Sequence, residues 1–211
     1  MAPPLAVSSP HVRRFLLILA ACSSSPKATP PVTPPPPAGE GLKPVEAFAS
    51  IGDRSARSRA LFGEVARVLT SARCSNCHPP DDVPRQGDHH VLHDPPIIRG
   101  TANNGVDGLH CGTCHQDRNA ELARIPGAPA WQLAPLQMAW LDRTPSQICA
   151  QLSDPKRNGG RSLAQVHDHL AHDKLVAWGW APGANRIPAP GSQAQVAALF
   201  QAWIDSGAVC P

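Results

Sequence analysis

Four of the seven cysteines in this 211-residue chain fall in two identical arrangements that could do chemistry. Residues 74–78 read Cys-Ser-Asn-Cys-His, and residues 111–115 read Cys-Gly-Thr-Cys-His. On a helical turn, positions i, i+3 and i+4 share one face, so both thiols and the imidazole point the same way. This pattern is typical of covalent attachment of c-type haem, in which the thiols form thioethers and the imidazole binds the iron. The sequence therefore predicts two haems, held by Cys74, Cys77 and His78 and by Cys111, Cys114 and His115.

Two other uses of paired cysteines fit the spacing less well. A four-cysteine zinc site favours about 15–20 residues between the pairs, whereas 33 residues separate Cys77 from Cys111. Zinc also gives no reason for a histidine directly after each pair. A thioredoxin-like redox pair needs a single C-x-x-C within a βαβ pattern, which the sequence lacks.

The second axial ligand of each iron has to come from another segment. Met138 is the only methionine besides Met1, and it lies in an irregular stretch with Trp131 and Trp140. A thioether in such a loop is a usual haem ligand, although a methionine also serves as a core gap-filler. Met138 is therefore one candidate.

Histidines supply the other candidates. His93 lies in a Gly- and Pro-rich loop over residues 81–108, and prolines 95 and 96 stiffen its surroundings. A helix beginning near residue 163 carries His167 and His169, which flank its apolar stripe on opposite sides, so periodicity does not choose between them. His172 falls far from that stripe and is expected to be exposed.

The N-terminal segment indicates export. Arg13 and Arg14 precede a short apolar run that ends in Leu-Ala-Ala-Cys at Cys22. This order resembles a bacterial lipoprotein signal, which implies removal of residues 1–21 and lipid attachment at Cys22. Residues 22–45 are rich in Pro, Ser and Thr and predict a semi-rigid tether. Residues 46–211 would then form one haem domain on the periplasmic side of a bacterial membrane.

Composition limits the other functions. The net charge of +3 and the lack of a basic cluster exclude a nucleic-acid-binding surface. The sequence shows no combination of nucleophile, base and acid, so catalytic residues are not expected. Redox proteins are the expected partners, together with the membrane reached through the lipid.

Helix signals surround the two haem segments. Residues 53–72 form a predicted helix, with an apolar stripe of Leu61, Val65, Val68 and Leu69. Three capping boxes begin at Thr144, Ser162 and Ser192 and predict further helices to about residues 152, 174 and 207.

Resemblances add to this interpretation. The helix before Cys74 and the segment 202–208 (Ala-Trp-Ile-Asp-Ser-Gly-Ala) resemble the first and last helices of small class I cytochromes c. Residues 74–211 also resemble bacterial two-haem proteins labelled isoquinoline 1-oxidoreductase subunit, through segments 126–129, 158–161, 178–183 and 207–211. These resemblances imply a mainly α, cytochrome c-like haem domain with long irregular loops, and the second favours His169 over His167. They imply electron transfer, with a dihaem peroxidase or a cytochrome subunit of a periplasmic molybdenum hydroxylase or dehydrogenase as alternatives.

Cysteine counting leaves one pair without a role. After Cys22 and the four haem cysteines are assigned, Cys149 and Cys210 remain. An even remainder in an oxidising compartment predicts a disulfide.

Overall fold

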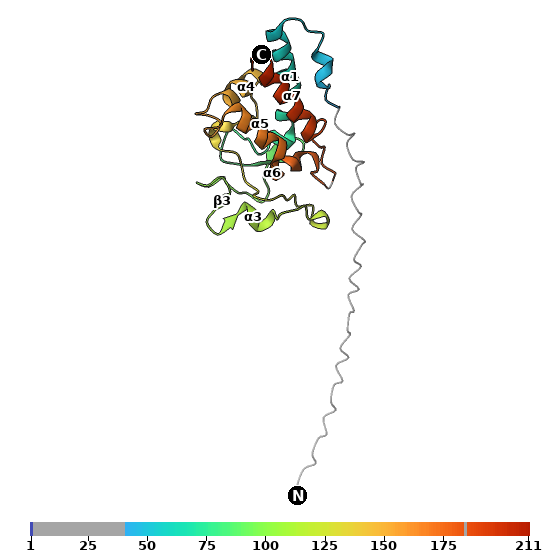
Figure 1. Ribbon diagram of the computed structural model, residues 1–211. Helices are drawn as coiled ribbons and strands as arrows, with labels where there is room; N and C mark the ends of the chain where they lie inside the picture. Colours follow the sequence, from blue (N-terminus) through green and yellow to red (C-terminus); the bar gives the residue numbers. More distant parts are fainter. Residues whose placement is uncertain (2–40, 184) are drawn as a thin grey trace. The chain divides into compact units, whose positions relative to one another are not determined.

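The computed structural model describes residues 1, 41–183 and 185–211 (Figure 1). Nearly all of the expected signal segment, the expected lipidation site Cys22 and most of the expected tether lie outside these residues. No helix within the described ranges is long and apolar enough to cross a membrane. The described part is mostly helical, as the sequence predicts, and it also contains two short hairpins.

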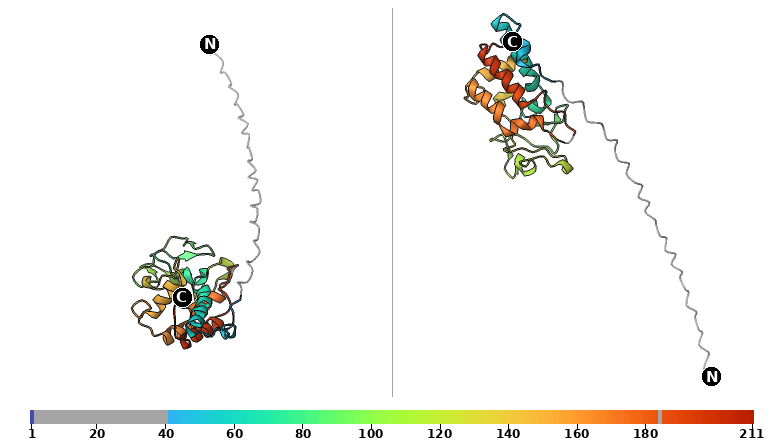
Figure 2. Two further views of the ribbon diagram at one scale, coloured as in Figure 1. Left: turned by 90° about the horizontal axis from the view of Figure 1, so that it is seen from above. Right: turned by 45° about the vertical axis from the view of Figure 1, so that its right-hand side comes forward.

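The core is built where the first long helix meets the last. Helix α1 (Arg54–Leu69) and helix α7 (Gln193–Asp205) pack side by side (Figures 1 and 2). The predicted stripe of α1 is buried, and the Phe62 ring lies 5.0 Å from the Trp203 ring of α7. Helix α5 (Leu163–His172) packs on α7, and helix α4 (Pro145–Ser153) contacts α1.

Local signals set the ends of these helices. Asp53 caps α1 by accepting a hydrogen bond from Ala56 N. Full capping boxes begin α4 at Thr144 and α5 at Ser162, which confirms two predicted boxes, whereas Ser192 caps α7 only through Gln195 N.

The predicted end of the first long helix differs from the structure. Helix α1 ends at Leu69 rather than near residue 72, and a separate short helix α2 (Ala72–Ser75) carries the first cysteine. The break occurs because Thr70 and Ser71 turn their hydroxyls back to the carbonyls of Ala66 and Val68, competing with continuation of the helix.

Residues 81–108 contain hairpins where a long irregular loop was expected. Strands β1 (Arg85–Gln86) and β2 (Val91–Leu92) pair antiparallel, with Arg85 opposite Leu92. Strands β3 (Gly105–Val106) and β4 (Leu109–His110) do the same and lead directly into helix α3 (Cys111–Cys114). Strands of two residues leave too little alternation for the sequence to reveal them.

Short helices complete the described part. They are the 3-10 helices Val45–Phe48, Glu121–Ala123, Leu136–Met138 and Trp178–Trp180, and helix α6 (Lys174–Ala177).

The disulfide between Cys149 and Cys210 is present, with 5.6 Å between their Cα atoms. It ties α4 to the chain just beyond α7, as the cysteine count predicts.

Candidate haem sites

The first C-x-x-C-H segment opens into a cavity. Cys74, Cys77 and His78 all contribute to its wall, as the helical spacing predicts. The rest of the wall is mainly apolar and comes from segments far along the chain: Leu69, Leu133, Leu152, Val166, Leu170, Val176, Trp178 and Phe200. A cavity with two thiols and an imidazole on an apolar wall suits a c-type haem, which is held by thioether bonds and buries an apolar macrocycle.

The ring of His78 is fixed from two directions. Its Nδ1 lies 2.6 Å from the carbonyl oxygen of Met138, and its face stacks on Trp140 with 3.5 Å between ring centroids. A carbonyl has no proton to give, so Nδ1 carries the hydrogen and donates it. Nε2 therefore keeps its lone pair, which is the tautomer that binds a metal.

Burial lowers the pKa of His78 to about 4, so the ring is neutral at neutral pH. Burial likewise raises the pKa of the Cys74 thiol to about 12 and that of Cys77 to about 11. Within the described ranges, moreover, no group of three or more His, Cys, Asp or Glu side chains is placed to hold a metal ion. The four thiols are therefore not gathered as a zinc site.

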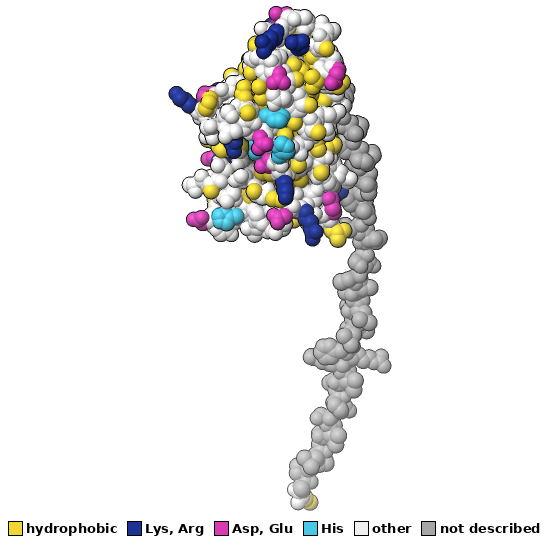
Figure 3. All heavy atoms as spheres, viewed as in Figure 1, with side chains coloured by type: hydrophobic (Ala, Val, Ile, Leu, Met, Phe, Trp, Pro, Cys, Tyr) yellow, Lys and Arg dark blue, Asp and Glu magenta, His cyan; other side chains and the backbone are white. Residues whose placement is uncertain are grey.

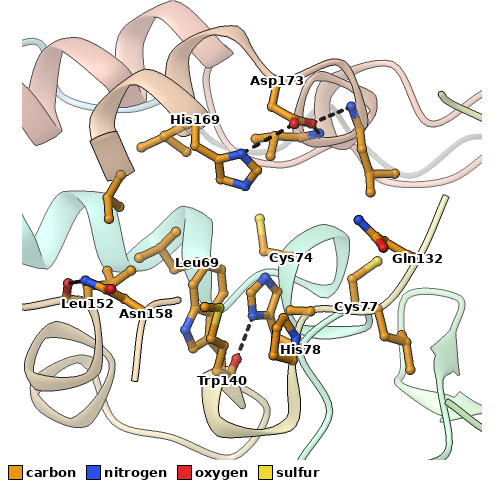
Figure 4. Close-up of a pocket in the computed structure, with 18 of the residues that line it drawn as sticks. Leu69, Cys74, Cys77, His78, Gln132, Trp140, Leu152, Asn158, His169 and Asp173 are labelled. Atoms are coloured by element: carbon orange, nitrogen blue, oxygen red, sulfur yellow. Dashed lines mark hydrogen bonds and ion pairs between the residues drawn. The ribbon is translucent and has the colours of Figure 1, made fainter. Parts of the chain in front are cut away.

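His169 faces His78 across the cavity. Figure 4 shows the His169 ring on the opposite side from His78, with the sulfur atom of Cys74 lying between the two rings in this view and that of Cys77 to one side. Nδ1 of His169 lies 3.4 Å from a carboxylate oxygen of Asp173, one turn further along. A second pair, His172 and Asp168, lies on the same helix at 2.9 Å, and histidine and acidic side chains gather over α5 in Figure 3. Only His169 of the α5 histidines lines the first cavity; His167 does not, and His172 is exposed as predicted.

Met138 enters the site from the His78 side. Its carbonyl accepts the His78 hydrogen bond, and its side chain is buried in the cavity wall. The residue therefore orients His78 through its backbone, a role that the sequence analysis did not foresee.

The second C-x-x-C-H segment repeats the arrangement of the first. Nδ1 of His115 donates to the carbonyl of Pro126 at 2.7 Å, and its ring stacks on Trp131 with a centroid distance of 4.6 Å and an angle of 8°. Burial lowers the pKa of His115. This site is more open than the first, because Cys114 is exposed.

His93 faces His115. The ring centroids are 5.8 Å apart with an interplanar angle of 67°, and Nδ1 of His93 donates to the carbonyl of Pro95 at 2.8 Å. Two imidazoles on opposite sides of one metal ion would have centroids about 6 Å apart, given metal–nitrogen bonds of about 2 Å. A separation of this size leaves room for one metal ion between the rings, so both histidines would be within reach of the same iron. His110 is exposed in β4 next to Cys111.

The two sites are linked by one short segment. Ala134 N donates to the carbonyl of Cys77, and Leu133 N donates to the carbonyl of Asn103, whose neighbour Asn104 accepts from Cys111 N. Within the same segment, the Trp131 ring that stacks on His115 meets the edge of Trp178 at 4.9 Å.

The tryptophans are the site residues that sequence reasoning left without a role. A signal was available, because five of the nine aromatic residues are Trp and none is Tyr.

Comparisons with protein-family models, curated proteins and solved structures found no match to this chain.

Proposed function

We propose that this chain is an electron-transfer protein that carries two covalently bound c-type haems. One observation supports this above all: two C-x-x-C-H segments 37 residues apart present the same local structure. In each, the histidine donates Nδ1–H to a backbone carbonyl and stacks on a tryptophan. A structural cysteine pair would not require the neighbouring imidazole to be held twice in the metal-binding tautomer.

In this proposal both irons have two histidine ligands. His78 and His169 would bind the first, and His115 and His93 the second. Met138 is the weaker candidate, because its backbone lies against His78 on the proximal side, and its thioether would have to pass the porphyrin edge to reach the other face. A dihaem peroxidase would need an iron with an open position, which two histidines per iron leave in neither site.

Haem would supply a one-electron iron couple at each site. The protein would hold each proximal imidazole, line the first site with a mainly apolar wall, and leave the second site exposed at Cys114. Redox partners would therefore exchange electrons with the more exposed second site. Electrons would then pass between the second site and the first across the segment of Trp131 to Ala134, which touches both sites. We place this exchange on the periplasmic side of a bacterial membrane, with Cys22 as the lipid anchor.

Ligand replacement tests the proposal. The mature protein should exceed its polypeptide mass by two haems, and magnetic circular dichroism should show bis-histidine iron without a methionine–iron band. His169→Ala and His93→Ala should each change one iron and leave the other, whereas Met138→Leu should change neither.

Matched controls come from the same segments. His167→Ala lies on α5 outside the cavity, and His89→Ala lies in the β1–β2 hairpin, so both should preserve the spectrum. A protein without haem, or with bound zinc, would refute the proposal. A lost methionine band in Met138→Leu would return the sixth position of one iron to that residue.

A further inference from the structure

A four-residue segment of the loop between α4 and α5 forms part of the wall of the first cavity. It reads Asn158-Gly159-Gly160-Arg161, and both its first and last residues line the cavity. Asn158 is 3% exposed, and its amide is fully engaged. Its Nδ2 donates to the carbonyls of Leu152 and Arg161, and its Oδ1 accepts from Arg161 N. The backbone of Arg161 is therefore held on both sides by one buried side chain.

Gly159 makes room for the Arg161 side chain. The residue has φ +79°, and a Cβ atom there would lie 2.7 Å from Nη1 of Arg161 and 3.0 Å from Cε of Met138. A side chain at this position would therefore push the guanidinium away from where it lies against the cavity.

The guanidinium of Arg161 has N–H groups available for a further ligand. Its Nη1 donates to the carbonyl of Asn158 at 3.1 Å. Among the described residues it forms no ion pair with a carboxylate. An arginine held at the edge of an apolar cavity, with free N–H groups and no acidic partner, is suited to an anionic ligand, and its planar fork matches a carboxylate.

The other arginine of the cavity wall is already engaged. Arg73 forms an ion pair with Asp88 and donates to the carbonyl of Gly87, and it neighbours Cys74 in the sequence. Arg161 belongs to a different part of the wall: Figure 4 shows its loop partner Asn158 at the end of the cavity away from Cys77. The position of Arg161 away from the cysteines matters because a haem tied to two cysteines through its vinyl groups carries both propionates on its opposite edge.

We propose that Arg161, positioned by Asn158 and Gly159, binds a propionate of the haem in the first site. The inference rests on the proposed function. It assigns the loop a role in setting the reduction potential of that haem, because a positive charge beside the cofactor favours the reduced, less positive state.

The test compares two arginines four residues apart. Arg161→Gln removes the charge at the cavity, and Arg157→Gln removes an equal charge at an exposed position in the chain that leads into the same loop. Both midpoint potentials are measured by spectroelectrochemical titration, with haem content from the protein mass and folding from circular dichroism. In Arg161→Gln one midpoint should fall by about 59 mV, a tenfold change in a one-electron equilibrium. That midpoint should belong to the haem whose spectrum changes in His169→Ala. Arg161→Lys should recover part of the shift, and Arg157→Gln should move neither midpoint.

The outcomes separate the two proposals. A wild-type protein without haem refutes the proposed function. Two haems with unmoved midpoints in Arg161→Gln, or equal shifts in Arg161→Gln and Arg157→Gln, refute the propionate contact alone. If Arg161→Gln fails to fold, Arg161→Met, which also removes the charge, decides: a midpoint identical to that of the wild type would overturn the inference, and a fall would support it.

Discussion

Removal of the Cys149–Cys210 disulfide should lower the stability of the protein without disturbing its folded structure. The bond joins residues 61 apart in the sequence, so it closes a loop of about 62 residues in the unfolded chain. In the chain-entropy model, opening such a loop costs roughly 4 kcal/mol of stability. The melting temperature should fall by about 8–16 °C for a domain of this size.

The folded end of the chain has other attachments. Val209 N donates to the hydroxyl of Ser58 at 2.9 Å, and Nε1 of Trp203 donates to the carbonyl of Val209 at 3.1 Å. These bonds should keep the C-terminus in place in the double variant Cys149→Ala/Cys210→Ala. The stability lost in this variant therefore reflects the greater conformational entropy of its unfolded chain rather than lost packing in the folded state.

The assay is denaturation followed by circular dichroism, with and without a phosphine reductant. Reductant should bring the wild type close to the double variant and leave the variant unchanged, because the proposed haem thioethers are not disulfides. A stability loss below about 1 kcal/mol would refute the loop-entropy reasoning, and so would alkylation of both thiols in the non-reduced, denatured wild type.

Two further predictions concern the proximal side of the first site. Trp140→Phe should keep the stack on His78 but leave buried Gln151 without the hydrogen bond that Nε1 gives its Oε1 at 2.7 Å, so urea denaturation should show a loss of about 1–3 kcal/mol with the haem spectrum unchanged. The second prediction concerns the chain prepared without haem. There the pKa of His78 is about 4 in the folded state, below the value of about 6.5 in the unfolded chain, so the folded state binds fewer protons. The free energy of unfolding should therefore fall by up to about 3 kcal/mol as the pH drops from 6.5 to 4. A pH-independent unfolding free energy over that range would show that the ring is not buried in the haem-free fold.

Local signals in the sequence predicted much of the helical frame. The cap at Asp53, the boxes at Thr144 and Ser162, and the apolar stripe of α1 all depend on residues within one or two turns of each other. The same locality placed Cys74, Cys77 and His78 on one cavity wall, since their spacing needs only a single helical turn. Counting cysteines sufficed for the Cys149–Cys210 pair because no other partner remained.

The surroundings of the proximal histidines depend on residues far along the chain. The carbonyl that orients His78 comes from Met138, 60 residues later, and the one that orients His115 comes from Pro126. A backbone carbonyl exists at every position, so no residue type marks it in advance. The sequence marked Met138 as a possible thioether ligand, but in the folded chain its backbone carbonyl is the group that contacts His78.

The opposite walls of both sites were decided by tertiary structure alone. His93 reaches His115 because the two-residue strands of the β1–β2 hairpin turn the chain back, and two residues carry no readable alternation. His167 and His169 flank the same apolar stripe, and helical periodicity treats them alike. The packing of α5 on α7 fixes which flank of α5 meets the cavity, and so it turns His169 toward it and leaves His167 outside.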